Sequence, residues 1–474
     1  MFLAGRILLV LGGLQLFPLA VALREPAADV RAFAVSAFGL LALGALLCFW
    51  GRQHKWYINV REGAAFMMLV WFSMTISGML PYLLMGELGF VDALFESVSG
   101  FTTTGATSLA GEVPPSLLLW HAMMQWIGGL SILVLLATVL PQVSGCFCIS
   151  MLMRQHSSES RRLQHIWQEA RRVLKVYVGF TLLVLVLFWL CGLDAFGSLN
   201  LALVTLSTGG GFDRSILQGS WLLQLAVIVC MVLVSGNFLL YWCMGRSAGR
   251  MRDLGHDSEF KTYLLMVAGF GLLLAWHLWH MGVYDGADSL RMGFFHVLSF
   301  SSTTGLTAAA VDTWPDFDRY VLFLLVFVGG CIGSPTGGIR MMRLMILFRS
   351  AAMGMRRTLH PHMVTSIQVN GIPVPPKILG RILHFFFLYM AVFFVFSLLI
   401  ALTGLEPLEA MGMSASCLSS VGSATMFGGD MTAFASLRTS TKLLCSFLMI
   451  LGRLEIFSFL LIMQSGFRDL HRKW

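Results

Sequence analysis

The sequence DALFESVSGFTTTGATS at residues 92–108 decides the fold. It begins with the acid Asp92, continues through mostly apolar residues and ends in a cluster of threonines around Gly105. A helix needs about 20 apolar residues to span a bilayer, so this segment is too short to cross, yet it is too apolar for an ordinary exposed loop. The pattern predicts a short helix that enters the membrane part-way and returns as a glycine-containing strand.

Three later segments repeat this pattern. They begin at Asp194, at Asp288 and at Glu406 or Glu409, and they end in STGGGF (207–212), SSTTGLT (301–307) and SSVGSAT (419–425). Their glycines follow one another at intervals of 106, 94 and 117 residues. One such segment alone would be read as an ordinary loop of small polar residues. Four in register indicate an internal repeat, and many transport folds are built from such repeats.

The composition of the whole chain requires a membrane. Of its 474 residues, 57% are hydrophobic and only 12% are charged, which is about half the charged share of a soluble protein. Such a chain cannot cover a water-exposed surface with polar groups, so a soluble globule, a disordered chain and a disulfide scaffold are excluded. The nine cysteines are interpreted as small apolar residues. The net charge of +8 is attributed to cytoplasmic Lys and Arg, and no nucleic-acid partner is expected.

Ten apolar segments are long enough to span the membrane. They are Phe2–Leu23, Ala32–Trp50, Ala64–Leu84, Leu117–Leu140, Val173–Leu193, Trp221–Met244, Tyr263–Met281, Tyr320–Phe348, Ile378–Leu402 and Lys442–Met463. The first has an alternative, because Arg6 and the small residues Ala20-Val21-Ala22 also fit a cleaved signal peptide. Lys442 lies near the start of the last span, and its side chain is expected to extend to the membrane interface.

Charge predicts the orientation. Basic residues accumulate in 51–62, 141–175, 339–381 and the C-terminal tail, which predicts that these segments and both termini are cytoplasmic. The segment 81–116 lies on the opposite side and contains no Lys or Arg. Its acids are Glu87, Asp92, Glu96 and Glu112. They predict an acidic outer vestibule that concentrates cations.

These features predict an all-α polytopic membrane protein with four pseudo-fourfold helix–pore loop–helix repeats around one pore, preceded by two extra helices. The predicted divisions are two N-terminal helices (1–60), repeat 1 (61–145), a basic cytoplasmic linker (146–171), repeat 2 (172–250), repeat 3 (251–358), and repeat 4 with a basic tail (359–474).

The four loops have the chemistry of a cation site. Irregular backbone at membrane depth occurs only where it is buried in protein or lines a watery cavity. Glycine allows carbonyls to turn inward, rings of carbonyls can replace the hydration shell of a cation, and Ser or Thr hydroxyls add further oxygens. An acid at the start of each short helix suits the positive end of its dipole, so the negative end is directed at the cavity and favours a cation.

Residues 329–338, GGCIGSPTGG, interrupt the span Tyr320–Phe348. Five glycines and Pro335 make a continuous helix unfavourable, by about 3 kcal/mol for the proline alone. Broken helices in membrane proteins mark sites or gates, so we expect a gate beneath the loops. A kink stabilised by close packing is the alternative, and the two are compatible.

Arg453 lies inside the last apolar span, two residues before Glu455. A charge at this depth normally faces the protein interior or a cavity. Two interpretations stay open. Arg453 is an electrostatic barrier to cations just inside the selectivity filter that the four loops would form, or it forms a buried pair with Glu455 that ties helices together.

No motif supports catalysis. GxxxxGK[ST], GxGxxG, GxSxG and HExxH are absent, so we expect neither an enzyme nor a cofactor. His121, His277, His280 and His296 are isolated and are expected to pack rather than to bind metal. The main alternative is a secondary transporter for an organic solute with the broken helix as its site. It predicts one or two interrupted helices instead of four loops in register.

The motifs at 92–108, QWIGG (125–129), GGCIGSPTGGIR (329–340) and LGRLEIFSFLL (451–461) resemble those of the Trk/Ktr/HKT superfamily of potassium transporters, closest to the bacterial TrkH/TrkG branch. The resemblance covers essentially the whole chain. It implies K+ uptake across the bacterial inner membrane by a lipid-embedded homodimer. It also implies a cytosolic nucleotide-binding, TrkA-like regulatory subunit that gates the pore.

Carried over by position, the resemblance implies filter glycines at Gly105, Gly305 and Gly422, a gating loop at 329–338 and an arginine that opposes ion passage at Arg453. The predicted ion-binding residues are Thr103, Thr104, Gly105, Thr208, Gly210, Gly211, Thr303, Thr304, Gly305, Ser420, Val421 and Gly422. The predicted gating residues are Gly329, Gly330, Gly333, Ser334, Gly337, Gly338 and Arg453.

The chain departs from the family pattern in the second and fourth loops. TGGGF replaces the usual ATGGF, so the key glycine is Gly210 or Gly211, and Gly211 is preferred because it precedes Phe212. Ser423 and Ala424 stand where relatives tend to have proline and glycine. These differences make a Na+-selective transporter an alternative. Coupling to protons or sodium as a symport is open, because the sequence shows no chain of intramembrane carboxylates.

Overall fold

The structure is a computed structural model. It describes residues 2–25, 30–51, 60–86, 88–109, 113–138, 162–211, 214–238, 240–241, 257–360, 366–422 and 434–454. Several sequence predictions concern residues outside these ranges, namely Glu87, Glu112, Phe212, Ser423, Ala424, Glu455, the linker residues 146–161 and the basic tail.

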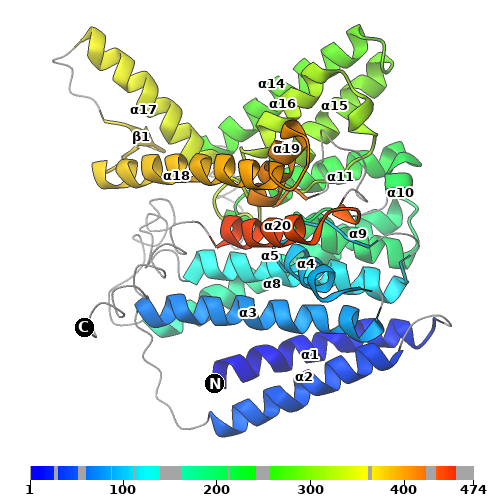
Figure 1. Cartoon of the computed structure of the whole chain (residues 1–474). Helices are drawn as coiled ribbons and strands as arrows, with labels where there is room; N and C mark the ends of the chain where they lie inside the picture. Colours follow the sequence, from blue (N-terminus) through cyan, green and yellow to red (C-terminus); the bar gives the residue numbers. More distant parts are fainter. Residues whose placement is uncertain are drawn as a thin grey trace.

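The described chain is helical apart from its loops and one two-stranded hairpin, which confirms the predicted all-α class (Figure 1). The elements before and within repeats 1 and 2 are α1 (Phe2–Ala22), α2 (Val30–Trp50), α3 (Val60–Met85), α4 (Phe90–Phe101), α5 (Pro115–Thr138), α8 (Arg162–Leu190), α9 (Ala195–Ser207), α10 (Arg214–Gln218) and α11 (Trp221–Val234). Those of repeats 3 and 4 are α14 (Ser258–His280), α15 (Gly286–Ser301), η3 (Val311–Thr313), α16 (Asp316–Val326), α17 (Met341–Leu359), β1 (Gln368–Val369), β2 (Ile372–Pro373), α18 (Pro376–Ala401), α19 (Pro407–Ser419) and α20 (Thr439–Arg453).

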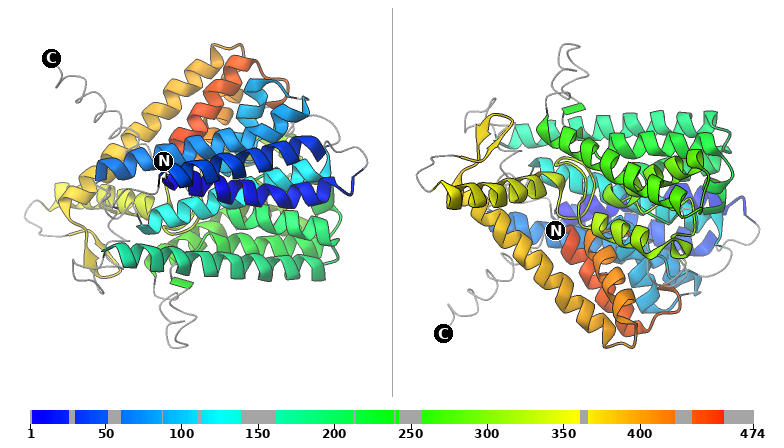
Figure 2. Two further views of the ribbon diagram at one scale, coloured as in Figure 1. Left: turned by 90° about the horizontal axis from the view of Figure 1, so that it is seen from below. Right: turned by 90° about the horizontal axis from the view of Figure 1, so that it is seen from above.

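Six of the described helices are long and apolar enough to cross a membrane: α1, α2, α5, α8, α14 and α18. Figure 2 shows the long helices running side by side. The interruption predicted in Tyr320–Phe348 is confirmed, because α16 ends at Val326 and α17 begins at Met341. The predicted span Trp221–Met244 is not one continuous helix in its described part: α11 ends at Val234, and Ser235 and Gly236 leave the helix. The last predicted span is described only as far as Leu454.

Four short helices, α4, α9, α15 and α19, form the centre of the fold. Each packs between the two long helices of its own repeat and the last helix of the preceding repeat, so that α4 contacts α20, α9 contacts α5, α15 contacts α11 and α19 contacts α16. The contact of α4 with α20 joins the first repeat to the fourth and closes the circle. The four repeats therefore surround one axis, as predicted.

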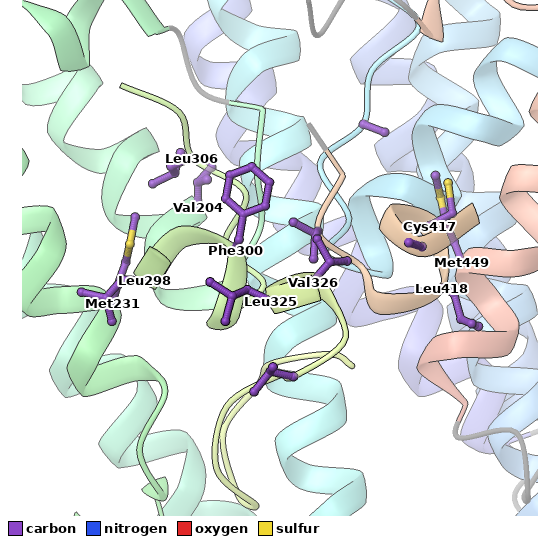
Figure 3. Close-up of a cluster of buried hydrophobic side chains, with 14 of the residues drawn as sticks. Val204, Met231, Leu298, Phe300, Leu306, Leu325, Val326, Cys417, Leu418 and Met449 are labelled. Carbon is purple, nitrogen blue, oxygen red and sulfur yellow. The ribbon is translucent and has the colours of Figure 1, made fainter. Parts of the chain in front are cut away.

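Apolar side chains fill the space between these helices and their neighbours (Figure 3). The labelled residues, all buried, are Val204, Met231, Leu298, Phe300, Leu306, Leu325, Val326, Cys417, Leu418 and Met449. They come from α9, α11, α15, α16, α19 and α20 and from the strand after α15. Packing from several repeats thus supports α9, α15 and α19.

The acids predicted at the starts of the short helices are confirmed. Asp194 is the N-cap of α9 and accepts a hydrogen bond from the backbone N–H of Gly197 at 3.3 Å. Asp92 and Asp288 lie in the first turns of α4 and α15, and Glu406 is the N-cap residue of α19. Negative charge at these ends stabilises the helix dipole.

Lys442 does not extend to the membrane interface as expected. It is 5% exposed, and its Nζ donates to Asp92 Oδ1 at 2.6 Å and to the carbonyl of Ala435 at 3.1 Å. Asp92 is on α4 and Lys442 on α20. This ion pair therefore lies at the closure between the first and fourth repeats, and local sequence could not predict it because the partners are 350 residues apart.

Replacing Lys442 by Met is expected to destabilise the protein by about 2 kcal/mol, because two acceptors lose a charged donor. The measurement is the melting temperature of purified protein in detergent. The matched control is Arg291→Met, which breaks the more exposed pair of Arg291 with Asp288 and should cost less than about 1 kcal/mol. Equal melting temperatures for the two variants would contradict a structural role for the Lys442–Asp92 pair.

Candidate functional site

One backbone feature recurs at the C-terminal end of all four short helices. Thr103, Thr208, Thr303 and Ser420 have φ angles of 54°, 56°, 57° and 58°. A left-handed conformation is uncommon for residues other than glycine, so its recurrence at four equivalent positions marks one shared design. All four residues are buried. At this residue the backbone of each repeat turns from the short helix into the strand.

The backbone hydrogen bonds of the turns are also equivalent. The residue after each left-handed one donates its N–H to the carbonyl five residues earlier: Thr104 to Ser99 at 2.9 Å, Gly209 to Val204 at 3.0 Å, Thr304 to Ser299 at 2.9 Å and Val421 to Ser416 at 2.9 Å. These bonds fix the register of the second loop against the others. Gly210 is the counterpart of Gly105, Gly305 and Gly422 by position.

The glycines have positive φ in three loops, at 74° for Gly105, 67° for Gly305 and 65° for Gly422. In the second loop the positive φ is found one residue later, at Gly211, with 86°. Position therefore favours Gly210 and conformation favours Gly211. Both lie beside Gly105, because a Cβ on Gly105 would collide with the backbone of Gly210, and one on Gly211 would lie 2.8 Å from the Gly105 carbonyl oxygen.

The first loop also meets the fourth. A Cβ on Gly422 would collide with the carbonyl oxygen of Thr104. Segments that are more than 300 residues apart in sequence are therefore packed backbone against backbone, at a distance that only glycine permits. The recurrent glycines are explained by this close approach as well as by their φ angles.

Side chains on the short helices and on α5 hold the strands in place. Ser99 Oγ donates to the Ala106 carbonyl at 2.6 Å, Ser299 Oγ to that of Leu306 at 2.5 Å and Ser416 Oγ to that of Gly422 at 2.8 Å. The second loop has Val204 at the equivalent place. There, Gln125 of α5 donates its Nε2 to the Gly210 carbonyl at 2.9 Å, so an amide from the preceding repeat takes over the role of the serine.

Glu96 does not line an acidic vestibule, which corrects the prediction. It is fully buried and accepts hydrogen bonds from the Oγ1 of Thr107 at 2.8 Å and from the backbone N–H of Ser108. His121 Nδ1 on α5 lies 3.3 Å from its other oxygen. Asp92 is likewise paired, with Lys442. These two acids therefore stabilise the first loop and the ring closure.

The interrupted segment between α16 and α17 is folded upon itself. The backbone N–H of Ile339 donates to the Phe327 carbonyl at 3.0 Å, and that of Met341 to the Gly330 carbonyl at 3.0 Å. Inside the segment, Thr336 Oγ1 accepts the N–H of Gly330 at 3.1 Å and lies 2.6 Å from Ser334 Oγ. The positive φ angles of Gly329, Gly333 and Gly338, 71°, 90° and 72°, permit its tight turns.

This segment lies against the starts of two loops, where α15 and α19 end, and against the break after α11. The N–H of Gly337 donates to Thr303 Oγ1 at 2.9 Å, and a Cβ on Gly337 would collide with the Ser419 carbonyl. On the other side, Cys331 N–H donates to the Ser235 carbonyl at 2.9 Å and Phe238 N–H to that of Gly333 at 3.1 Å. Two interrupted helices thus brace each other.

Arg453 reaches the start of the first loop, where α4 ends. It is 7% exposed, and its guanidinium donates to Thr103 Oγ1 at 2.6 Å. Thr208 Oγ1 donates to the Ser207 carbonyl at 2.7 Å, while Ser420 Oγ is buried without a hydrogen bond among the described residues. Two of the four left-handed hydroxyl residues thus accept hydrogen bonds from the proposed gate region. Thr103 accepts from Arg453, and Thr303 accepts from Gly337 of the interrupted segment.

Comparison with known proteins identifies the family of this chain. The sequence matches the family model of TrkH, described as a cation transport protein, over residues 30–467. The chain belongs to the TrkH family. The Trk system potassium uptake protein TrkH of Escherichia coli strain K12 is 30% identical over 475 residues, covering 98% of this chain and 97% of that protein. TrkG of the same strain is 28% identical and covers 95% and 94%.

The TrkH fold is also recognised in three dimensions. The crystal structure of the potassium transporter TrkH from Vibrio parahaemolyticus matches with a TM-score of 0.89 at 29% identity, covering 97% of each chain. This confirms the resemblance and the fold expected from sequence.

Sequence reasoning missed several residues that shape the TrkH-family site in this chain. Gln125 is part of the motif QWIGG, which by itself predicts no contact with the second loop, and the recurring serine at Ser99, Ser299 and Ser416 was not predicted. That serine lies four residues before Thr103, Thr303 and Ser420, so alignment of the repeats on these residues predicts it. The Ser235 break gave only a weak signal, a single Ser-Gly-Asn in an apolar run.

Proposed function

We propose that this protein takes up K+ across the bacterial inner membrane through a single filter made by the four loops. The observation that carries the proposal is the fourfold recurrence of one turn, a helix end followed by a left-handed Thr or Ser and a glycine strand, in four helices packed around one axis. Helix C-terminal ends and carbonyl-rich strands favour a cation. The names of the relatives, potassium uptake proteins, support K+ as the ion.

The filter is proposed to consist of residues 103–105, 208–211, 303–305 and 420–422. The gate is proposed to be the segment 329–338 together with Arg453. Support comes from the contacts of Gly337 with Thr303 and of Arg453 with Thr103, both directly at the inner ends of loops. A cation leaving the filter towards the cytoplasm would meet these two elements first.

The surroundings of the filter follow from the same proposal. The basic segments 141–175 and 339–381 favour a cytoplasmic position for these segments and for both termini. As in the resemblance described above, we propose a homodimer in the inner membrane, gated by a cytosolic nucleotide-binding TrkA-like subunit. No cofactor is proposed for this chain, and K+ is its transported ion.

An organic-solute transporter with the broken helix as its site is disfavoured by the contacts of that helix. Residues 329–336 are buried, and their hydroxyl and amide groups bond to one another, to Ser235 and to Glu259. A Na+-selective pore remains the rival within the same architecture, and the experiment must distinguish it.

The test is uptake of 86Rb+ in a bacterial strain without its own K+ uptake systems, and in liposomes that contain the purified chain. We expect growth of the strain on low K+ and inhibition of 86Rb+ uptake by K+ at concentrations at least about tenfold lower than by Na+, a preference of about 1.4 kcal/mol. Inhibition by Na+ alone would support the Na+-selective rival. Absence of uptake in cells that also contain the cytosolic subunit, with the protein present in the membrane, would contradict the proposal.

A further inference from the structure

A buried acid at the start of α14 bonds both to the interrupted segment and to the helix that follows it. Glu259 is 2% exposed. Its Oε1 accepts a hydrogen bond from the backbone N–H of Ile332 at 2.8 Å and from that of Met342 at 3.2 Å. Ile332 lies within the segment, and Met342 is the second residue of α17. One carboxylate oxygen thus joins the segment to the helix that follows it.

The start of α17 depends on this acceptor. The first N–H groups of a helix have no partner within the helix, and the side chain of the N-cap residue Arg340 supplies no capping hydrogen bond. Arg340 has a φ of 75°, which a bulky residue adopts only where its surroundings impose it. The hydrogen bond from the Met342 N–H to Glu259 therefore stabilises the first turn of α17.

The cytoplasmic hairpin is connected to the same place. Its tip residue Asn370 donates Nδ2 to Asp257 Oδ1 at 3.1 Å and accepts the N–H of Ser258 through Oδ1 at 2.9 Å. Asp257 is the N-cap of α14 and accepts the N–H of Glu259 at 3.1 Å. A continuous series of hydrogen bonds thus runs from the hairpin between α17 and α18, through Asp257 and Glu259, to the segment beneath the loops.

We propose that Glu259 is a positioning residue that keeps the interrupted segment under the filter, and that Asn370 at the hairpin tip supports it through the N-terminus of α14. The inference rests on the proposed gate function of the segment. Displacement of the hairpin would pull on the N-terminus of α14 and weaken the two bonds of Glu259. The segment would then leave Thr303, to which Gly337 is bonded.

The first test measures flux without any partner. In liposomes, Glu259→Leu is expected to raise basal 86Rb+ uptake by about tenfold, equivalent to about 1.4 kcal/mol, with K+ preference over Na+ retained. Glu259→Gln keeps one acceptor oxygen and should give a smaller rise, as should Asn370→Ala. Lys261→Gln, an exposed neighbour on α14, should match the wild type. Unchanged or reduced uptake for Glu259→Leu would overturn the proposal and leave the filter itself untouched.

The second test follows the segment directly. Cys331 is 1% exposed and lies in the segment, whereas Cys445 is fully buried in α20. In chains in which Cys331 or Cys445 is the single remaining cysteine, maleimide labelling of Cys331 should accelerate in Glu259→Leu while that of Cys445 should not. Acceleration at both would indicate general loosening and would overturn the proposal, as would acceleration at neither.

The two readouts separate the failure of this inference from failure of the proposed function. If the wild type and every variant lack selective flux, the K+ uptake proposal fails. The labelling of Cys331 still decides whether Glu259 positions the segment, because it does not depend on the transported ion.

Discussion

Gly105→Ser is expected to abolish selective K+ uptake. Gly105 has a φ of 74°, where any other L-residue is destabilised by roughly 1–2 kcal/mol, and a Cβ there would collide with the backbone of Gly210. The first and second loops must move apart to accommodate it, which disturbs the carbonyl positions on both. We expect the preference for K+ over Na+ to fall by at least about tenfold, or about 1.4 kcal/mol, in the liposome assay.

The matched control for this variant is Gly282→Ser. Gly282 has a similar φ of 70°, but a Cβ there would meet nothing within 4 Å. It lies in the turn between α14 and α15, distant in sequence from the four loops. Gly282→Ser therefore carries the backbone strain without the collision, and uptake should retain its selectivity. If Gly105→Ser is folded and as selective as Gly282→Ser, the filter assignment is wrong for the first loop.

Arg453→Gln is expected to increase K+ uptake by about tenfold. The guanidinium contacts Thr103, so a cation at the inner end of the filter lies close to a fixed positive charge. At an effective dielectric constant of about 20, two like charges about 4 Å apart repel by about 4 kcal/mol. A third of this, about 1.4 kcal/mol, corresponds to a factor of ten. Uptake of 86Rb+ into liposomes, normalised to the amount of inserted protein, measures the change.

Arg453→Lys provides the control, since it keeps the charge while replacing the planar guanidinium. Its uptake should stay nearer to the wild type than that of Arg453→Gln. Thr103→Val removes the acceptor and leaves the charge in place, so it tests the hydrogen bond separately. If Arg453→Gln melts and elutes like the wild type and transports no faster, Arg453 is only a structural link between α20 and the first loop.

The local sequence predicted much of this fold, because its main signals are local. Each of these signals lies within a single segment. The apolar spans predict helix length, the acids predict the starts of the short helices, and the recurring glycines predict the turns. The interruption at Gly329–Gly338 was predictable for the same reason, since proline and glycine act on the backbone where they occur. The family resemblance then placed these elements in the known order.

The contacts that complete the site were not predictable from local pattern. Glu259 bonds to Ile332 over 73 residues, Gln125 to Gly210 over 85, and Arg453 to Thr103 over 350. In the sequence, Glu259 looks like an ordinary solvent-exposed acid in the first turn of a helix. Only the fold shows that it is buried and bonded to Ile332. Thr103, Thr208, Thr303 and Ser420 were predicted as site residues, but their left-handed backbone was not, because positive φ is usual for glycine and uncommon for Thr or Ser.

The most direct test of the central claim, that the four loops form one K+-selective filter, is the reversal potential of the purified chain in a planar bilayer. With K+ on one side and Na+ on the other, the account predicts a potential that follows K+, with about 59 mV for each tenfold in permeability ratio of a monovalent ion. Gly105→Ser measured alongside should move the potential towards zero. A wild-type current that reverses near zero, or that follows Na+, would contradict the claim.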